Sequence, residues 1–324
     1  MTPAEFALRL DAARAEIAKV IVGQRPLVDT VLMATLCEGH VLLEGVPGLG
    51  KTRLLATLGR VLDVEFGRIQ FTPDLMPADI LGTKVLQGTD FKFHEGPVFA
   101  NLVLADEVNR ATPKTQSALL EAMQERRVTL GGETHVLPRP FLVMATQNPI
   151  EMEGTYPLPE AQLDRFLFKA LVPFPPGDDV VEILRRTTTA YQAEPEPVLD
   201  GTAILGMAAL VRDLPAATHL LRYAATLVEA THPGSPLAPE AIARYVRHGA
   251  SPRGAQAMVL GGKAAALMDG RPNLAAEDVW AVAHRALRHR LVLGYEAIVD
   301  EVTPDRLVDE VLAAHPSPVA ERER

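Results

Sequence analysis

Gly-Val-Pro-Gly-Leu-Gly-Lys-Thr, residues Gly45 to Thr52, directly follows the apolar run Val41-Leu42-Leu43. The stretch matches the pattern G-x-x-x-x-G-K-[ST], in which a buried strand leads into a glycine-rich loop and then a helix. The expected helix covers about Gly50–Leu62 and directs its positive N-terminal end at the loop. A glycine-rich turn that binds nothing is the alternative, and the order of strand, loop, lysine and helix argues against it.

The residue types in this loop are typical of a site for a nucleoside triphosphate. Gly45, Gly48 and Gly50 carry no Cβ, so backbone N–H groups can wrap a β-phosphate. Lys51 would place its charge on the β- and γ-phosphates, and Thr52 would offer its hydroxyl to Mg²⁺. The predicted nucleotide contacts in the loop and the first helical turn are Gly45, Val46, Pro47, Gly48, Leu49, Gly50, Lys51, Thr52 and Arg53.

Apolar strands alternate with helices over the first half of the chain. The expected strands are Val41–Leu43, Glu65–Phe71, Leu102–Ala105, Phe141–Ala145 and Phe168–Val172. Their apolar residues are continuous, as expected for a parallel sheet that is covered on both faces. The expected helices of this part are Pro3–Val20, Pro26–Glu38, Gly50–Leu62, Pro113–Gln124 and Glu160–Phe166. The pattern predicts a doubly wound α/β fold.

The run Pro173-Phe174-Pro175-Pro176-Gly177 predicts a domain boundary near Pro173. Residues 1–173 would form the nucleotide-binding domain, residues 174–314 a smaller all-α domain, and residues 315–324 a disordered tail. No convincing strand is visible after the boundary. The longest expected helix is Ala275–Leu293, in which Trp280, the only tryptophan, occupies an apolar position that indicates a core residue.

Two adjacent carboxylates, Asp106 and Glu107, end the apolar strand Leu102–Ala105. Successive side chains of a strand point in different directions, so the two can have different tasks. Asp106 could bind Mg²⁺, while Glu107 polarises the water that attacks the γ-phosphate. An acidic pair that only caps the following helix is the alternative, and the phosphate loop at the appropriate distance favours hydrolysis.

Asn148 follows the strand Phe141–Ala145, and Pro149 prevents that strand from continuing. An amide beside Glu107 could hydrogen-bond the attacking water or the γ-phosphate without competing for a proton. In isolation, an amide at this position is more often a turn former.

Two arginines lie where a helix ends or begins. Arg165 ends the short helix near Glu160–Phe166, where it could reach the γ-phosphate of a neighbouring subunit as an arginine finger. An ion pair with Asp164 or Glu160 is the alternative. Arg253 opens a helix of the second domain and could report the nucleotide state to that domain; an exposed arginine without a function is its alternative.

Composition limits the class of protein. The chain has 324 residues, 48% of them hydrophobic, and a formal net charge of −9, which argues against a broad nucleic-acid-binding or anionic-membrane surface. Cys37 is the only cysteine, so an intrachain disulfide is excluded. The acidic residues of the N-terminal helix argue against a signal or transit peptide, and no apolar stretch is long enough to span a membrane. We therefore expect a cytoplasmic protein.

With these elements in this order, the chain resembles the MoxR family of AAA+ ATPases, in the helix-2-insert clade. The most specific segments are 93–99 (Phe-His-Glu-Gly-Pro-Val-Phe), 105–111 (Ala-Asp-Glu-Val-Asn-Arg-Ala), 116–125 (Gln-Ser-Ala-Leu-Leu-Glu-Ala-Met-Gln-Glu), 145–149 (Ala-Thr-Gln-Asn-Pro) and 158–166 (Leu-Pro-Glu-Ala-Gln-Leu-Asp-Arg-Phe).

The resemblance implies Walker A and B elements at Gly45–Thr52 and Leu102–Glu107, sensor 1 at Asn148, the arginine finger at Arg165 and sensor 2 at Arg253. It implies a helix-2 insert at about 85–99 and a hairpin before sensor 1 at about 127–137. The segment that would line the adenine pocket consists of Ile21, Val22, Gly23 and Gln24.

For function, the resemblance implies ATP and Mg²⁺ as cofactors and a homo-oligomer, with a hexameric ring as the expectation. The ATPase would drive chaperone-like remodelling, maturation or metal-cofactor insertion of a client protein. In similar systems the client can contain a von Willebrand factor A domain. No nucleic-acid partner and no membrane span are expected.

Two alternatives to this function stay open at this point. The first is a nucleic-acid motor, because helix-2-insert relatives include such enzymes and Arg126, Arg127 and Arg139 flank the expected hairpin. Aromatic residues for base stacking are not interleaved with these arginines. The second is an ATP-gated scaffold with little turnover, against which the presence of Glu107 argues.

Overall fold

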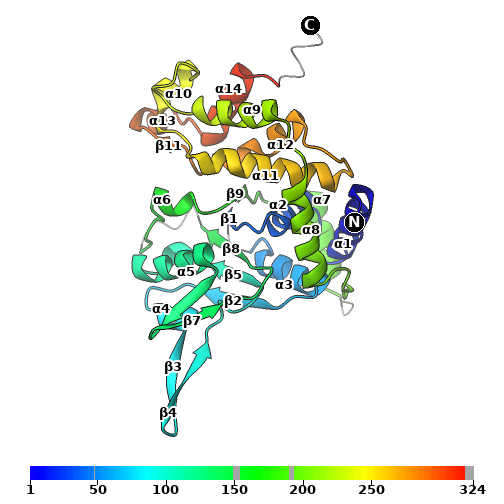
Figure 1. The fold of residues 1–324 in the computed structure, drawn as a ribbon, viewed down its shortest axis with the longest axis vertical. Helices are drawn as coiled ribbons and strands as arrows, with labels where there is room; N and C mark the ends of the chain where they lie inside the picture. Colours follow the sequence, from blue (N-terminus) through cyan, green and yellow to red (C-terminus); the bar gives the residue numbers. More distant parts are fainter. Residues whose placement is uncertain (47, 149–153, 190–192, 318–324) are drawn as a thin grey trace. The chain divides into compact units, whose positions relative to one another are not determined.

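The structure is a computed structural model, and the residues that it describes are 1–46, 48–148, 154–189 and 193–317. The chain divides into two compact units (Figure 1). The α/β unit comprises Leu8–Leu158 and Ala170–Gly206. The helical unit comprises Met1–Ala7, Pro159–Lys169 and Met207–Arg324. The limits 1–173 and 174–314 expected for the two domains stay a prediction.

The α/β unit is built on the predicted parallel sheet. Its strand order is β2-β5-β8-β1-β9, and β1 pairs in parallel with β8, β8 with β5, and β5 with β2. The strands are β1 (Val41–Glu44), β2 (Phe66–Gln70), β5 (Leu102–Asp106), β8 (Leu142–Gln147) and β9 (Phe168–Leu171). The apolar residues of β1, β5 and β8 are buried on both faces of the sheet, as their continuous apolar sequences predict. The doubly wound α/β fold is thereby confirmed.

Helices alternate with these strands along the chain. They are α1 (Pro3–Ala18), α2 (Arg25–Leu36), α3 (Lys51–Val61), α4 (Pro77–Leu81), α5 (Pro113–Glu125), the short 3₁₀ helix η1 (Val108–Arg110), α7 (Gly177–Thr187) and α8 (Gly201–Asp213). Residues of α1 and α8 belong to both units. Cys37, which follows α2, is buried and packs as a small hydrophobic residue.

Two antiparallel hairpins extend the α/β unit. The strands β3 (Gly82–Gln87) and β4 (Asp90–Glu95) form a hairpin that projects from the unit (Figure 1). The helix-2 insert predicted at about 85–99 overlaps this hairpin. The strands β6 (Arg127–Leu130) and β7 (Glu133–Val136) form the hairpin predicted before sensor 1. Gly131 and Gly132 have φ angles of 57° and 84° in its two-residue turn, a conformation that favours glycine.

After α8, the described residues of the helical unit form α9 (Thr218–Glu229), α10 (Glu240–Tyr245), α11 (Pro252–Met268), α12 (Ala276–Leu287), α13 (Tyr295–Val299) and α14 (Pro304–Ala314). It also contains α6 (Glu160–Leu163). Helices α11 and α12 pack against each other, and α9 packs on α11. The predicted tail, residues 315–324, lies mostly outside the described residues.

Three expectations for this unit were wrong. The short strands β10 (Val246–His248) and β11 (Val292–Leu293) pair antiparallel, so the unit is not purely helical. The helix expected at Ala275–Leu293 ends at Leu287, because β11 takes up its last residues. Trp280 is 46% exposed rather than buried, since the buried stripe of α12 follows the spacing 279, 282, 283 and 286 and leaves position 280 outside.

In the described part of the chain, no single helix is long and apolar enough to cross a membrane. The bent pair α8 and α9 would pass such a test by length and composition only.

Candidate functional site

The phosphate loop connects β1 to α3 in the α/β unit. Gly48 and Gly50 have φ angles of 85° and 76°, which L-residues with a side chain rarely adopt. At Gly45 the reason for glycine is different, because a Cβ would lie 2.8 Å from the Cβ atom and the carbonyl oxygen of Val172. Glycine is thus required at Gly45 for packing against the chain that follows β9, and at the other two positions for the turn itself.

Lys51 begins α3 and lies half-buried below the loop. Its Nζ atom donates a hydrogen bond to the carbonyl oxygen of Gly45 at 2.7 Å. Burial lowers the pKa of Lys51, while the negative charges of Asp106 and Glu107 oppose that shift. A phosphate group with several negative charges would stabilise the charged form of Lys51 in the same way.

Asp106 ends β5 and faces two polar side chains from neighbouring strands. Its Oδ1 atom accepts a hydrogen bond from Thr146 Oγ1 at 2.8 Å. Its Oδ2 atom pairs with Arg68 Nη2 of β2, also at 2.8 Å. The carboxylate is therefore held in one orientation at the carboxyl edge of the sheet, the edge at which ligands of such folds bind.

Glu107 has the backbone conformation φ 57°, ψ 50°, the left-handed region that is sparsely populated by residues other than glycine. Its N–H donates to Thr146 Oγ1 at 2.8 Å. Its Oε2 atom accepts from Gln70 Nε2 at 3.1 Å and pairs with Arg110 Nε at 3.0 Å. Such strained residues occur preferentially at functional sites, where surrounding contacts hold them. Here the contacts come from β2, β8 and η1.

These groups surround one pocket of about 500 Å³. Asn148, which is buried directly after β8, lines the pocket together with the carboxylates. The lining consists of Gly45, Gly48, Leu49, Gly50, Lys51, Thr52, Arg53, Arg68, Gln70, Asp106, Glu107, Thr146 and Asn148. Of the loop residues predicted to contact nucleotide, Val46 is not part of this lining and Pro47 lies outside the described residues.

The sequence analysis missed three residues of this pocket: Arg68, Gln70 and Thr146. Arg68 and Gln70 alternate along β2 at its carboxyl end, where an otherwise apolar strand turns polar. Those polar residues at the end of a strand could have indicated that the strand end belongs to a binding site. Their relation to Asp106 depends on β2 and β5 being neighbours in register, with Gln70 opposite Asp106, and a single sequence does not reveal that pairing.

A second pocket, of about 360 Å³, adjoins the first and shares Gly48, Leu49, Gly50 and Arg53 with it. Its remaining lining is mostly apolar and comes from two segments: Val20, Ile21, Val22 and Gln24, and then Phe174, Pro175, Val180, Ile183, Arg186 and Thr187. Apolar walls beside a phosphate site suit a purine ring. Three of the four residues predicted to line an adenine pocket therefore line this one.

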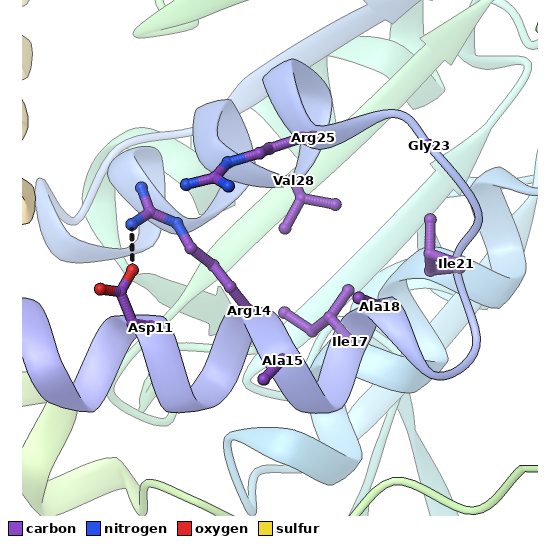
Figure 2. Close-up of a pocket in the computed structure, with 9 residues that line it drawn as sticks. All are labelled: Asp11, Arg14, Ala15, Ile17, Ala18, Ile21, Gly23, Arg25 and Val28. Atoms are coloured by element: carbon purple, nitrogen blue, oxygen red, sulfur yellow. Dashed lines mark hydrogen bonds and ion pairs between the residues drawn. The ribbon is translucent and has the colours of Figure 1, made fainter.

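Gly23, the fourth predicted adenine-pocket residue, has a different environment. Its φ is 60°, and a Cβ at this position would overlap an Asp179 carboxylate oxygen. Figure 2 shows a further pocket that Gly23 and Ile21 also line, together with residues of α1 and α2. Arg14 of that pocket pairs with Asp11 at 2.8 Å, as drawn there.

The two predicted arginines, Arg165 and Arg253, belong to the helical unit. Arg253 lies in the first turn of α11 and its Nη1 atom is 3.5 Å from Asp164 Oδ2. Among the described residues, Arg165 makes no side-chain hydrogen bond or ion pair, so the predicted alternative of a pair with Asp164 or Glu160 is absent there.

Comparison with known proteins identifies the family. The sequence profile described as "ATPase family associated with various cellular activities (AAA)" matches residues 40–168, and that of an AAA lid domain matches residues 239–311. The chain is 46% identical to Chaperone MoxR1 of Mycobacterium tuberculosis, over 94% of this chain and 81% of that protein. It is 34% identical to the protein MoxR of Paracoccus denitrificans, over 96% and 97%. The chain belongs to the MoxR family of AAA+ ATPases.

A solved structure agrees with this assignment. A crystal structure from Cytophaga hutchinsonii, provisionally named an ATPase, is 38% identical in sequence and superposes with a TM-score of 0.92 over 97% of this chain and 96% of the other. Membership of the MoxR family makes this protein an ATPase.

The residues at this pocket fit a nucleoside triphosphate and a hard divalent cation. Lys51 and the loop N–H groups match the phosphates, and the oxygens of Thr52 and Asp106 are the ligands that Mg²⁺ prefers. No group of three or more His, Cys, Asp or Glu side chains among the described residues could hold a metal ion by itself. An ion at Thr52 and Asp106 would therefore need phosphate oxygens and water as further ligands.

Proposed function

We propose that this MoxR-family ATPase hydrolyses ATP with Mg²⁺ at the phosphate-loop pocket and uses the energy to remodel a client protein. The observation that carries the proposal is the convergence of Lys51, Asp106, Glu107 and Asn148 in the lining of one pocket. Each of these residues supplies a different requirement of phosphoryl transfer, and the sequence spreads them over about 100 residues.

In this proposal Lys51 and the loop bind and orient the β- and γ-phosphates. Thr52 and Asp106 would hold Mg²⁺, which supplies positive charge to the phosphate oxygens. Glu107 accepts a proton from the attacking water, and Asn148 positions that water or the γ-phosphate by a hydrogen bond. The contacts that Thr146, Gln70 and Arg110 make to Glu107 support this role, because a general base must be held within reach of one water molecule.

The unit of function would be a ring of identical subunits, for which a hexamer is expected. Arg165 would act on the γ-phosphate bound by the neighbouring subunit, and Arg253 would report the nucleotide state. The absence of a described partner for the Arg165 side chain supports this role, because an arginine finger must be free to meet a phosphate. Fingers of this kind contribute about 10³ to 10⁵ in rate where measured.

For the client, the name Chaperone MoxR1 of a relative 46% identical supports a chaperone-like role. The client would be a protein that the ring remodels or matures, or into which it helps to insert a metal cofactor. A protein with a von Willebrand factor A domain is one candidate. A pull-down with Glu107→Gln protein in ATP, with Lys51→Ala as the control that should not bind nucleotide, would identify it.

The alternative of a nucleic-acid motor loses support in this structure. Arg126 and Arg139 both pair with Glu38 Oε1, at 2.9 and 2.7 Å, and Arg127 pairs with Glu125 at 3.3 Å. The three arginines that flank the β6–β7 hairpin thus already face carboxylates. Binding of single-stranded DNA that falls steeply with salt would favour the alternative.

A mixing experiment tests the shared site. Arg165→Ala and Glu107→Gln proteins should each be nearly inactive, and an equimolar mixture should regain turnover in sites that combine an intact Glu107 with an intact Arg165 from the next subunit. In a ring with one kind of head-to-tail interface, random assembly gives about one site in four that has both an intact Glu107 and an intact Arg165. A mixture as inactive as its components would contradict a finger acting between subunits.

A further inference from the structure

The segment Pro159–Lys169, which contains Arg165, belongs to the helical unit although the strand β9 begins within it. Side chains from the turn that follows α12 hydrogen-bond to the backbone of this segment. His289 Nε2 lies 3.0 Å from the carbonyl oxygen of Phe166, and both histidine and its neighbour Arg290 are buried. The contacts of these two residues explain why the segment groups with the helices.

Arg290 makes most of these contacts. Its side chain is only 2% exposed, and its Nη2 atom donates to the carbonyl oxygens of Asp164 at 3.1 Å and Phe166 at 2.7 Å. Its Nε atom donates to Asp164 Oδ1 at 2.9 Å, and its Nη1 atom donates to the carbonyl oxygens of Leu167, at 3.3 Å, and Ala286. Arg290 therefore binds the residues immediately before and after position 165.

The carboxylate of Asp164 connects this contact to the second predicted arginine. Besides Arg290, it accepts hydrogen bonds from Ser251 Oγ, at 2.9 Å to each oxygen, and lies 3.5 Å from Arg253 Nη1. Ser251 is also the N-cap of α11, whose side chain accepts from the N–H of Arg253. The carboxylate of Asp164, the residue before Arg165, thus contacts the N-terminal end of α11, which carries Arg253.

The chemistry of this contact requires arginine. Burial lowers the pKa of Arg290 to about 10, with the nearby charge of Asp164 opposing the shift, so the guanidinium stays charged at neutral pH. A lysine could keep the charge but has no planar fork with which to bind two carbonyl oxygens and a carboxylate at once. A buried charge without these partners would be strongly unfavourable, which fixes the segment to α12.

We propose that Arg290 is a positioning residue for Arg165, and that through Asp164 it joins Arg165 and Arg253 into one rigid body within the helical unit. The finger would then move with the helices of its own subunit rather than with the sheet. The catalytic part of this inference rests on the proposed function, in which Arg165 acts on ATP. The positioning part does not.

The matched pair of variants is Arg290→Lys and Arg288→Lys. Arg288, two positions earlier, forms a forked pair with Asp305 at 2.9 and 3.0 Å, and its Nη1 atom donates at 3.3 Å to the carbonyl oxygen of Lys169, four residues after Arg165. Fluorescence of Trp280, the only tryptophan, and thermal unfolding would check that both variants fold. If Arg290→Lys does not fold, Asp164→Asn takes its place, because it keeps the side-chain volume and removes the charge that Arg290 and Arg253 share.

Amide hydrogen exchange tests positioning directly. In the full-length protein, Arg290→Lys should speed exchange at the N–H groups of Arg165 and Phe166, which bond to the carbonyl oxygens of Gln162 and Leu163. We expect the exchange rate to rise tenfold or more, which corresponds to the loss of about one hydrogen bond to a charged group. In Arg288→Lys the exchange rate should change less than twofold. Unchanged exchange in Arg290→Lys would overturn the inference, whatever the ATPase activity.

Turnover then tests the catalytic consequence. Arg290→Lys should lower kcat by about 10- to 100-fold, since a small misplacement of a catalytic group has effects of this size, while the KM for ATP stays within threefold. Mixed with Glu107→Gln, it should regain activity, because a site can then combine an intact Glu107 with a correctly placed Arg165. Mixed with Arg165→Ala, it should not, because neither protein supplies a correctly placed Arg165. Recovery with Arg165→Ala, or an unchanged kcat, would refute the catalytic part.

The failure of the proposed function would look different. If Arg165→Ala mixed with Glu107→Gln stays inactive, the finger does not act between subunits, and faster exchange in Arg290→Lys would still establish the positioning contact.

Discussion

Thr146→Val is the substitution that tests most sharply how the two carboxylates are held. Thr146 is 1% exposed, and its hydroxyl donates to Asp106 Oδ1 and accepts from the N–H of Glu107, both at 2.8 Å. Valine has the same shape without the hydroxyl, so the substitution removes both hydrogen bonds and leaves the N–H of Glu107 unpaired.

The expected cost follows from these contacts. A hydrogen bond to a charged group contributes about 1.5–3 kcal/mol, and an unpaired buried N–H costs about 1–3 kcal/mol. Burial of the added methyl group returns about 0.8 kcal/mol. We therefore expect Thr146→Val to lower the free energy of unfolding by about 2–4 kcal/mol, given that such terms are not fully additive.

The effect on turnover has a separate cause. Glu107 is in the left-handed region, a conformation that costs about 1–3 kcal/mol and persists only while surrounding contacts hold it. Without the bond to Thr146, Glu107 should shift, and misplacement of a catalytic group by about 1 Å can lower the rate about 100-fold.

Urea unfolding and steady-state ATP turnover would measure the two effects. Thr146→Ser keeps the hydroxyl and should retain most of the activity, because only a methyl group is lost. A Thr146→Val protein that unfolds within about 0.5 kcal/mol of the wild type and hydrolyses ATP at the wild-type rate would refute this account of the site.

Two further predictions concern stability. Burial lowers the pKa of His40 to about 4 from the ordinary 6.5, so between these pH values the unfolded chain binds a proton that the folded chain does not. The stability present above pH 6.5 is therefore lost as the pH falls towards 4, by about 2 kcal/mol at pH 5. Urea unfolding of His40→Gln should show a flatter pH dependence than that of the wild type. Asp278 is 4% exposed and accepts hydrogen bonds from Arg271 and from the N–H of Ala275. The Arg271 side chain is 38% exposed and would still reach water, so Asp278→Ala should lower the free energy of unfolding by about 1–3 kcal/mol in thermal unfolding. Asp269→Ala, which removes an exposed partner of the same arginine, should change it by less than about 1 kcal/mol.

The sequence predicted the features that depend on neighbouring residues. The phosphate loop and the carboxylates at the end of β5 each have their pattern within about ten residues, and for both the strand or loop lies where it was expected. The parallel sheet was predictable for the same reason, since each buried strand has its own continuous apolar run.

Features that depend on distant contacts could not be predicted in this way. Arg68 and Thr146 belong to the pocket only because β2 and β8 are the neighbours of β5, an order that no local pattern specifies. Similarly, Pro159–Lys169 groups with the helices through Arg290, which lies more than 120 residues later in the chain. The short pair β10 and β11 contains too few residues to produce a recognisable alternation.

The central claim is that Glu107 is the general base of an ATPase site at the phosphate loop. Its most direct test compares wild type with Glu107→Gln for binding of ATP with Mg²⁺ and for hydrolysis in a single turnover. The account predicts ATP affinity within about threefold and hydrolysis slower by about 100-fold or more, because glutamine keeps the shape but cannot accept the proton. Hydrolysis by Glu107→Gln at the wild-type rate would contradict the claim.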